Sequence, residues 1–345
     1  MTRSVLIAVG GSGGHLLPAQ QLAKILQQES QVTFAGFQLS KSPFFQKESF
    51  FFQDIEAAPL APFTRFLRKS SKGVMQSLRL LRTLNPDVVI GFGSYHAFPI
   101  LAAAVLLRKK ILLYEANCVL GKVNRLFSPF ADLLAIQFPL EKPVRRNYQY
   151  ASYFPWVKNK EAHTKQEALQ SYGLNGTLPV CLVFGGSQGA AFFNETAPIV
   201  LSGCQVIHCT GSEETVENVR SLYQGLQIRA FVQSFESDMA KAYAAADFAL
   251  CRSGAATISE LIQYQVPAVL VPFPYAADGH QEVNARFFCS SAQGGVWLAQ
   301  RERELLSFKV QECLKRQQEF GQSLQLFYQK TKKRIELADL VREIW

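Results

Sequence analysis

The stretch from residue 10 to residue 14 holds four glycines in five positions, between an apolar run over 4–9 and a helical pattern over 18–28. This order predicts a strand, a tight turn and a helix. Glycine has no Cβ, so such a turn can adopt positive φ and let a phosphate or a sugar approach bare backbone N–H groups. The following helix directs the partial positive charge of its N-terminus to the same place. The stretch, which we name the first glycine loop, therefore predicts an α/β unit with a binding site at a strand end.

A dinucleotide-binding turn is the rival interpretation, and the spacing of the glycines disfavours it. Starting from Gly11, the third glycine of a G-x-G-x-x-G motif would stand at Leu16. The next strand-like run, 31–36, continues into Phe37 and Gln38 and offers no acidic residue to hold a ribose. An NAD site is therefore not expected, whereas a turn that binds nothing stays open.

The glycine turn recurs at two further strand ends. A second glycine loop, residues 91–95, closes the strand-like run 88–91, and a third, residues 185–190, follows the run 180–184 and opens another helical pattern. Further strand-like runs, which alternate with helical patterns, cover 5–9, 32–36, 111–114, 205–209, 228–231, 248–251 and 268–271. Two similar halves with glycine loops at strand ends predict two α/β domains with parallel sheets that face each other across a cleft.

A polar stretch over 148–165, which contains Pro155, is the predicted linker between the two domains. We therefore expect an N-terminal domain over 1–157 and a C-terminal domain over 158–329. An amphipathic segment at about 330–345 is expected to pack back across the first domain.

Composition narrows the class of protein. The longest apolar run, 97–107, is far shorter than the roughly 20 residues that span a bilayer, and no signal peptide precedes the first strand, so we expect a cytoplasmic protein without a transmembrane helix. The seven cysteines form no C-x-x-C pair, which favours buried reduced thiols over disulfides or zinc ligands. The sequence has no D-x-D pair and its five histidines are scattered, so no metal is expected.

The net charge of +9 is concentrated in the first half of the chain. Residues 1–157 carry 18 lysines and arginines against 8 acidic residues, whereas the remainder carries 18 against 19. Residues 62–84 interleave apolar and basic side chains: Phe63, Phe66, Leu67, Val74, Met75, Leu78 and Leu81 with Arg65, Arg68, Lys69, Lys72, Arg79 and Arg82. This pattern predicts an amphipathic helix on an anionic membrane surface, and a core helix with a solvated basic side stays an alternative. Nucleic acid is not expected, because no binding module accompanies the charge.

Six motifs stand in order along the chain: GGSGGHLLP, GFGSY, YEANCVLGKVN, GGSQGA, CRSGAATISE and HQEVNA. Their combination, over essentially the whole sequence, resembles the MurG family of bacterial glycosyltransferases. The resemblance implies a two-domain GT-B fold and an inverting transfer of N-acetylglucosamine from UDP-GlcNAc to the 4-hydroxyl of a lipid-linked MurNAc-peptide. It implies no cofactor, a peripheral position on the cytoplasmic side of the inner membrane, and partners among other cell-wall synthesis proteins.

The resemblance places most of the donor site in the second half of the chain. Glu260 would accept hydrogen bonds from the ribose hydroxyls, and a solvated helix carboxylate is its plain alternative. The segment at Phe235 would contact uracil. The residues that the resemblance assigns to UDP-GlcNAc are Ser12, Gly13, Gly14, Asn117, Lys158, Ser187, Gln188, Phe235, Glu236, Ala255, Ala256, Thr257, Glu260, His280 and Gln281.

The acceptor side would belong to the first half, with His15 as the general base. A neutral imidazole can accept the proton of an attacking sugar hydroxyl, although His15 as a mere brace of its loop stays an alternative. Glu115 is the second catalytic candidate. The residues assigned to the acceptor are Gly93, Ser94, Tyr95 and Asn124. For His96, packing and substrate contact are both open.

Three departures from the family pattern limit the transfer of these roles. Ala116 stands where the family has glutamine, and Ser12 stands where threonine is commoner. The interdomain motif of the family ends in arginine, whereas residues 153–158 end in Lys158. A lysine supplies the charge without the bidentate geometry of arginine.

Three other functions compete with this prediction. Another GT-B transferase, for example one that glycosylates diacylglycerol, would share the donor half. A UDP-sugar epimerase would need further acid and base groups beside the donor sugar. A non-catalytic protein that binds nucleotide sugars would have lost its base, and the presence of His15 and Glu260 disfavours it.

Overall fold

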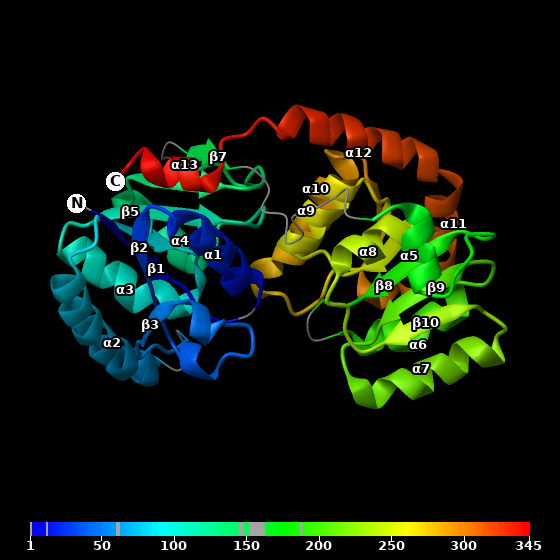
Figure 1. The fold of residues 1–345 in the computed structure, drawn as a ribbon, viewed down its shortest axis with the longest axis horizontal. Helices are drawn as coiled ribbons and strands as arrows, with labels where there is room; N and C mark the ends of the chain where they lie inside the picture. Colours follow the sequence, from blue (N-terminus) through cyan, green and yellow to red (C-terminus); the bar gives the residue numbers. More distant parts are fainter. Residues whose placement is uncertain (1, 12, 60–62, 145–147, 152–162, 187–188) are drawn as a thin grey trace. The chain divides into compact units, whose positions relative to one another are not determined.

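The structure is a computed structural model that describes residues 2–11, 13–59, 63–144, 148–151, 163–186 and 189–345. The chain divides into two compact units, Met1–Phe154 with Lys333–Trp345, and Pro155–Lys332 (Figure 1). The boundary that the sequence predicts at residues 157 and 158 lies outside the described residues.

The first unit is built on a parallel sheet. Among the described residues its seven strands lie in the order β3-β2-β1-β4-β5-β6-β7. The strands are β1 (Arg3–Ala8), β2 (Ser30–Gly36), β3 (Phe51–Asp54), β4 (Val88–Gly91), β5 (Lys110–Glu115), β6 (Leu133–Ile136) and β7 (Tyr148–Tyr150). The helices are α1 (Gly13–Leu26), α2 (Phe63–Leu84), α3 (Ser94–Leu106), α4 (Lys122–Phe127) and α13 (Leu337–Arg342), with short 3₁₀ turns η1 (Leu39–Lys41), η2 (Lys47–Ser49) and η3 (Ser128–Phe130).

Alternate residues of β1 feed two cores, one on each face of this sheet. Val5 and Ile7 join a cluster that includes residues of α1 and α13, whereas Leu6 and Ala8 join a cluster that includes residues of α2, α3 and α4. Successive side chains of a strand point to opposite faces, so a sheet covered on both faces requires an uninterrupted apolar run. This requirement explains why β1 shows no alternation of apolar and polar residues.

The second unit repeats the plan with six parallel strands among its described residues, in the order β10-β9-β8-β11-β12-β13. The strands are β8 (Val180–Phe184), β9 (Gln205–Cys209), β10 (Ala230–Gln233), β11 (Phe248–Cys251), β12 (Ala268–Leu270) and β13 (Gly295–Trp297). The helices are α5 (Lys165–Ser171), α6 (Ala191–Val200), α7 (Glu213–Gly225), α8 (Met239–Ala245), α9 (Ala255–Tyr264), α10 (His280–Ser290), α11 (Leu306–Lys315) and α12 (Gln317–Thr331), with 3₁₀ segments η4 (Ala277–Gly279) and η5 (Gln300–Leu305).

Each sheet has a point where the strand order reverses. In the first unit β1 and β4 are neighbours, and in the second β8 and β11 are neighbours, although other strands lie between them in the sequence. Ligands of open α/β sheets bind beyond the carboxyl ends of the strands at such points. The three glycine loops follow β1, β4 and β8, so all three stand at these positions.

Two elements begin away from the positions that their patterns predict. Helix α1 starts at Gly13 rather than at residue 18, so His15 lies in its first turn and not in a loop. Strand β10 starts at Ala230 rather than at residue 228, because the N–H of Ile228 donates to the carbonyl of Tyr223 (2.9 Å) and closes the end of α7.

The C-terminal segment completes the core of the first unit. Helix α13 belongs to the first unit (Figure 1). Its Leu337, Leu340 and Val341 are fully buried in the cluster that contains Val5 and Ile7. Within the described part of the chain, no helix combines the length and the apolar character that crossing a membrane requires.

Candidate functional site

The first glycine loop rests on the ring of His96. A Cβ added to Gly10 would lie 2.8 Å from the Cβ of His96, and one added to Gly11 would lie 3.0 Å from its Cε1. Gly11 also has a φ of +88°, a conformation that other residues rarely adopt. These two positions therefore require glycine for packing as well as for the shape of the turn, which links the first and second glycine loops.

His96 is itself held by its neighbours. Its Nδ1 lies 2.6 Å from the Oγ of Ser94, its ring stacks on Tyr95 with a centroid distance of 3.9 Å, and Phe37 stacks on it at 5.9 Å. Burial, helped by the charge of His15, lowers the pKa of His96 to about 4. His96 is thus a neutral packing residue at physiological pH, which favours the packing alternative over direct contact with substrate.

His15 lies in the first turn of α1, is half-buried and interacts electrostatically with His96. Gly13 and Gly14 form the same turn, and the first N–H groups of a helix have no partners within it. Ser94 begins α3 with a φ of 66°. Ser12 lies outside the described residues.

Glu115 organises the loop that follows β5. Its Oε1 accepts hydrogen bonds from the backbone N and the Nδ2 of Asn117, both at 3.1 Å. Its Oε2 accepts from the N–H of Gly121 (2.9 Å) and the Nδ2 of Asn124 (3.0 Å). Glu115 is only 4% exposed, so both oxygens of this catalytic candidate are engaged by its own loop.

Asn124 joins this loop to the second glycine loop. Its Nδ2 also donates to the carbonyl of Tyr114 (2.9 Å), and a Cβ on Gly93 would lie 3.3 Å from that nitrogen. The structure thus gathers the predicted residues of the first unit beyond the ends of β1, β4 and β5, which are adjacent strands.

In the second unit the third glycine loop is closely packed. A Cβ on Gly185 would lie 2.4 Å from the backbone N of Ala190, and one on Gly189 would lie 2.2 Å from the carbonyl oxygen of Thr210. Ser187 and Gln188 of this loop, like Lys158, lie outside the described residues.

The neighbouring strand β11 leads into α9 through Gly254, its N-cap, which provides no side-chain cap. The backbone N–H groups of Ala255, Ala256 and Thr257 therefore begin a ten-residue helix at the reversal point of the sheet. Such a helix start is an anion-binding position.

Glu260 is buried within α9. Only 5% of it is exposed, and its Oε2 accepts a hydrogen bond from the hydroxyl of Tyr243 on α8 (2.8 Å). The ring of Tyr243 stacks on Tyr264 at a centroid distance of 5.0 Å. Burial raises the pKa of Glu260 to about 7, partly offset by the bond from Tyr243. The alternative of a solvated helix carboxylate is therefore wrong.

The start of α10 is fixed by two polar side chains. The Nδ1 of His280 lies 2.7 Å from the carbonyl oxygen of Ala277, so this nitrogen carries the proton and Nε2 is the acceptor in the neutral ring. The side-chain Oε1 of Gln281 accepts a hydrogen bond from the N–H of Phe273 (2.9 Å). The backbone carbonyl of Gln281 accepts one from the Oγ of Ser253 (2.7 Å). The last bond ties α10 to the segment that precedes α9.

Arg252, between β11 and α9, is a residue of this region to which the sequence motifs assign no role. Its guanidinium donates to the carbonyls of Val271 (3.0 Å) and Pro272 (3.2 Å) and to the Oε1 of Gln300 (2.7 Å). Among the described residues no carboxylate pairs with it, and burial lowers its pKa to about 10. The sequence signal that could have identified Arg252 is its place directly after an apolar strand and shortly before Gly254.

The described side chains of α2 divide the predicted amphipathic residues into buried and exposed ones. Leu81 is fully buried in the core and Leu78 packs against it, so these two side chains do not face a membrane. Met75 is 59% exposed, and four basic residues are exposed: Arg68, Lys72, Arg79 and Arg82. The side chains of Phe63, Arg65, Phe66 and Leu67 lie outside the described ones.

Comparisons with known proteins identify the family. The glycosyltransferase family 28 N-terminal domain matches residues 5–136, and the C-terminal domain of the same family matches residues 180–341. A protein from Protochlamydia amoebophila named UDP-N-acetylglucosamine–N-acetylmuramyl-(pentapeptide) pyrophosphoryl-undecaprenol N-acetylglucosamine transferase is 36% identical over 322 residues, 88% of this chain and 84% of the relative. A protein of the same name from Polaromonas naphthalenivorans is 35% identical and covers 87% of this chain and 86% of the relative.

Solved structures agree. A crystal structure of MurG from Acinetobacter baumannii aligns with a TM-score of 0.77 and 27% identity over 99% of each chain. Os79 from O. sativa, in complex with UDP, shares the fold at a TM-score of 0.71 and 12% identity over 99% of this chain and 100% of the other. The predicted GT-B fold, with two Rossmann-like domains, is confirmed. The chain belongs to glycosyltransferase family 28 and, within it, to the family of UDP-N-acetylglucosamine–N-acetylmuramyl-(pentapeptide) pyrophosphoryl-undecaprenol N-acetylglucosamine transferases.

Proposed function

We propose that the protein transfers N-acetylglucosamine from UDP-GlcNAc to the 4-hydroxyl of a lipid-linked MurNAc-peptide, with inversion, in peptidoglycan synthesis. The observation that carries the proposal is the buried carboxylate of Glu260, one turn inside an uncapped helix start at the reversal point of the second sheet. A carboxylate accepts two hydrogen bonds from a vicinal diol, and the helix start binds a diphosphate. The two features together fit the ribose and the diphosphate of a nucleotide sugar.

The donor is assigned to the second unit. The ribose binds Glu260, and the diphosphate binds the N–H groups of Ala255, Ala256 and Thr257 together with Ser187 of the third glycine loop. As the bond to the sugar breaks, negative charge develops on UDP. Fixed N–H groups stabilise that charge with little reorganisation, because they already point at the ligand. His280 and Gln281 contact the sugar and the phosphates.

The acceptor is assigned to the first unit. We assign the first glycine loop, whose Gly13 and Gly14 the resemblance gave to UDP-GlcNAc, to the pyrophosphate of the acceptor, and the second glycine loop to its sugar. His15 is the general base. The 4-hydroxyl oxygen forms a bond to the anomeric carbon, the bond from that carbon to the diphosphate oxygen breaks, and the hydroxyl proton passes to the imidazole of His15. A positioned base of this kind contributes roughly a hundred- to ten-thousand-fold to the rate.

Glu115 is assigned a positioning role. Because its two oxygens accept four hydrogen bonds from Asn117, Gly121 and Asn124, removing a proton from substrate would first require breaking some of them. Glu115 therefore fixes the loop that carries Asn117 and, through Asn124, the start of α4. Asn124 is only 1% exposed, so we assign it a positioning role rather than contact with the acceptor.

The test is transfer of labelled N-acetylglucosamine from UDP-GlcNAc to a lipid-linked muramyl-peptide, with diacylglycerol as the competing acceptor. We expect product only with the muramyl-peptide, and a loss of at least about a hundredfold in kcat for His15→Ala with UDP binding retained. Product with diacylglycerol alone would establish the other GT-B function. Binding of UDP-GlcNAc without transfer to either acceptor would establish the non-catalytic function, and near-wild-type turnover of His15→Ala would exclude this base.

The exposed basic residues of α2 support a peripheral position on an anionic membrane, on the cytoplasmic side where UDP-GlcNAc is available. We expect the protein to sediment with anionic vesicles and to be released by salt. Charge reversal of Arg79 and Arg82 to glutamate should weaken binding roughly thirtyfold or more, at about 1 kcal/mol for each basic residue near the surface. The same reversal at Arg301 and Arg303, which are exposed on the second unit, is the matched control. Binding that ignores both lipid charge and salt would contradict this assignment.

A further inference from the structure

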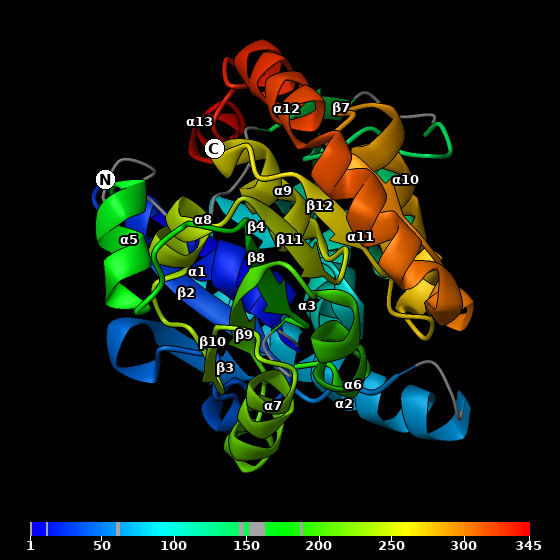
Figure 2. The same ribbon diagram turned by 90° about the vertical axis from the view of Figure 1, so that its right-hand side faces the viewer.

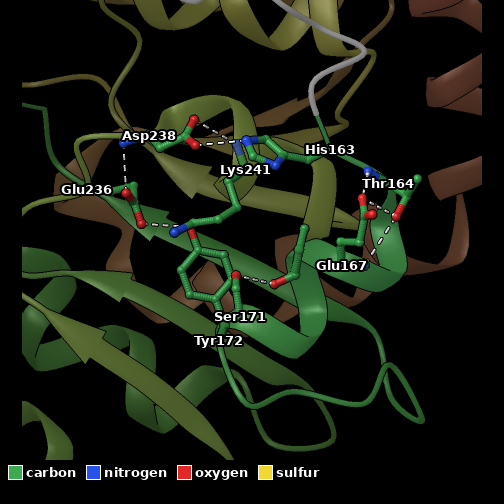
Figure 3. Close-up of polar contacts among 9 residues, drawn as sticks. His163, Thr164, Glu167, Ser171, Tyr172, Glu236, Asp238 and Lys241 are labelled. Atoms are coloured by element: carbon green, nitrogen blue, oxygen red, sulfur yellow. Dashed lines mark hydrogen bonds and ion pairs between the residues drawn. The ribbon is translucent and has the colours of Figure 1, made fainter.

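The turn between β10 and α8 contains a buried carboxylate that is held from three sides. Glu236 is only 6% exposed. Its Oε2 accepts a hydrogen bond from the hydroxyl of Tyr172 (2.6 Å), and its Oε1 accepts one from the N–H of Asp238 (2.8 Å) (Figure 3). The Nε2 of Gln233 also donates to Oε2 (2.8 Å). A buried carboxylate is stable only when its oxygens are hydrogen-bonded, so the position of Glu236 depends on these three donors.

Helix α5 holds this turn from both of its ends. Tyr172 follows the last residue of the helix, and His163 precedes its N-cap, Thr164. The Nε2 of His163 lies 2.8 Å from the Oδ2 of Asp238, and the Oδ1 of Asp238 accepts the N–H of Lys241 (3.3 Å) at the start of α8 (Figure 3). Side chains at the two ends of one short helix thus contact Glu236 and Asp238, which are two positions apart in the sequence.

The helix that applies these contacts is itself fixed. Thr164 and Glu167 form a capping box, in which the N–H of Thr164 donates to the Oε2 of Glu167 (3.0 Å) and the N–H of Glu167 donates to the Oγ1 of Thr164 (3.3 Å). The ring of Tyr172 packs edge-to-face on Phe231 at 5.0 Å, and the Nζ of Lys241 lies 4.9 Å from its centroid. Helices α5 and α8 pack side by side in the two views of Figure 1 and Figure 2.

The same turn is connected to Glu260. Helix α8 has seven residues, with Asp238 as its N-cap and Tyr243, which donates to Glu260, near its other end. Glu236 and Glu260 therefore each accept a tyrosine hydroxyl, and α8 lies between them. A shift of α5 would move the turn and, through α8, the partner of Glu260.

We propose that Tyr172 and His163 are positioning residues for the donor nucleoside, and that α5 acts as a clamp on the turn that contacts its base. The inference rests on the proposed function, because it takes Phe235 and Glu236 as the base-contacting segment. Phe235 is 63% exposed and stands between Gln233 and Glu236, whose side chains are bonded to each other. Backbone groups can distinguish the edges of bases only when their positions are fixed, and the clamp supplies that constraint.

The test measures the Kd of UDP and of CDP by calorimetry, on the full chain. Tyr172→Phe keeps the ring and its packing but removes the donor to Glu236. Because this bond is already present before UDP binds, we expect its loss to weaken UDP binding by up to roughly tenfold, the limit set by one hydrogen bond to a charged group, while kcat at saturating UDP-GlcNAc is unchanged. CDP differs from UDP at one edge of the pyrimidine ring, so its affinity should decrease less. The preference for UDP over CDP should therefore fall. A merely structural role would weaken both nucleotides alike.

Tyr223→Phe is the matched control. Tyr223 is a buried tyrosine of the same unit whose hydroxyl bonds the Nδ1 of His208 (2.9 Å), away from this turn. It should lower the melting temperature and leave the ratio of the two Kd values unchanged. His163→Ala, a change at a partly exposed side chain, tests the other end of the clamp and should lower the preference for UDP even if Tyr172→Phe does not fold.

The possible results distinguish failure of the clamp from failure of the proposed donor site. Wild-type protein that binds UDP, with an unchanged Kd ratio in both Tyr172→Phe and His163→Ala, would overturn the clamp and leave the donor site standing. Wild-type protein that binds neither UDP nor UDP-GlcNAc would overturn the donor site and the clamp with it.

Discussion

Glu260 is the residue whose pKa should change most directly when the proposed donor binds. Its carboxyl has a pKa of about 7 because it is buried, and it accepts one bond, from Tyr243. The ionised carboxylate accepts hydrogen bonds from two ribose hydroxyls better than the protonated carboxyl does, because protonation turns one of its oxygens into a donor, so binding should lower this pKa. A ligand that binds the ionised form must then release protons near neutral pH.

Uridine is the suitable probe, because it carries no titrating phosphate. At pH 7 about half of Glu260 is protonated, so binding should release roughly half a proton, and affinity should rise about tenfold from pH 6 to pH 8. Calorimetry in buffers of different ionisation enthalpy measures the proton directly. Both effects should vanish in Glu260→Gln and should decrease with 2′-deoxyuridine, which keeps only one of the two hydroxyls. The same pH dependence in the variant would exclude Glu260 as the titrating group.

Gly10 offers a second prediction, on stability. In Gly10→Ala the new Cβ would lie 2.8 Å from the Cβ of His96, whose ring is held by Tyr95 and Ser94. Such overpacking should destabilise the first unit by about 1–3 kcal/mol in urea unfolding. Gly225→Ala, where nothing lies within 4 Å of the added atom, is the control and should not destabilise. In a double-mutant cycle, His96→Gly, which removes the Cβ as well as the ring, should relieve much of the penalty; strictly additive losses would show that the His96 side chain is not the obstacle.

Among the elements, α6, β9 and α7 are joined by a buried histidine. The Nδ1 of His208 lies 2.9 Å from the hydroxyl of Tyr223, and its Nε2 lies 3.0 Å from the Oδ1 of Asn194. An amide oxygen only accepts, so Nε2 carries the proton and the neutral ring satisfies both partners. Burial lowers the pKa of His208 to about 3.

This histidine should make the second unit sensitive to acid. Below about pH 6.5 His208 is protonated in the unfolded chain, whereas in the folded chain it stays neutral until about pH 3. The free energy of unfolding therefore decreases as the pH falls through this window. The loss attributable to His208 should reach about 2 kcal/mol at pH 5. His208→Gln keeps polar atoms without titrating, so its stability should fall less between pH 7 and pH 5. Parallel curves for the two proteins would contradict the assignment.

The elements also mark the limit of what the sequence predicts. Glycine loops and strand-like runs are local signals, and they placed His15, Ser94 and Glu115 correctly at neighbouring strand ends. The bonds made by Glu115 depend on how the next loop folds back, which no local pattern encodes. Tyr172 and Glu236 stand 64 residues apart, so their contact becomes visible only once α5 packs against the turn.

At the scale of the whole molecule, the chain returns to its first unit after completing the second. Ile335 forms a parallel bridge with Ala151, and Arg334 donates to the carbonyl of Gln137 (2.6 Å) while its guanidinium lies 4.5 Å from the ring centroid of Tyr150. These contacts precede α13, whose buried side chains belong to the core around β1. The first unit is therefore built from segments at both ends of the sequence.

Truncation after Lys332 tests this architecture. It removes Leu337, Leu340 and Val341, which are fully buried, and their loss should destabilise the first unit by on the order of 5 kcal/mol. This is comparable with the whole stability of many domains, so the first unit should unfold or become protease-sensitive. The second unit should keep its own unfolding transition and its affinity for UDP, because the residues proposed to bind the ribose and the diphosphate lie within it. Arg342→Ala, which removes two half-exposed ion pairs, one with Glu29 and one with Asp339, should change little. Loss of UDP binding on truncation, with the second transition intact, would mean that the donor site also requires residues of the first unit.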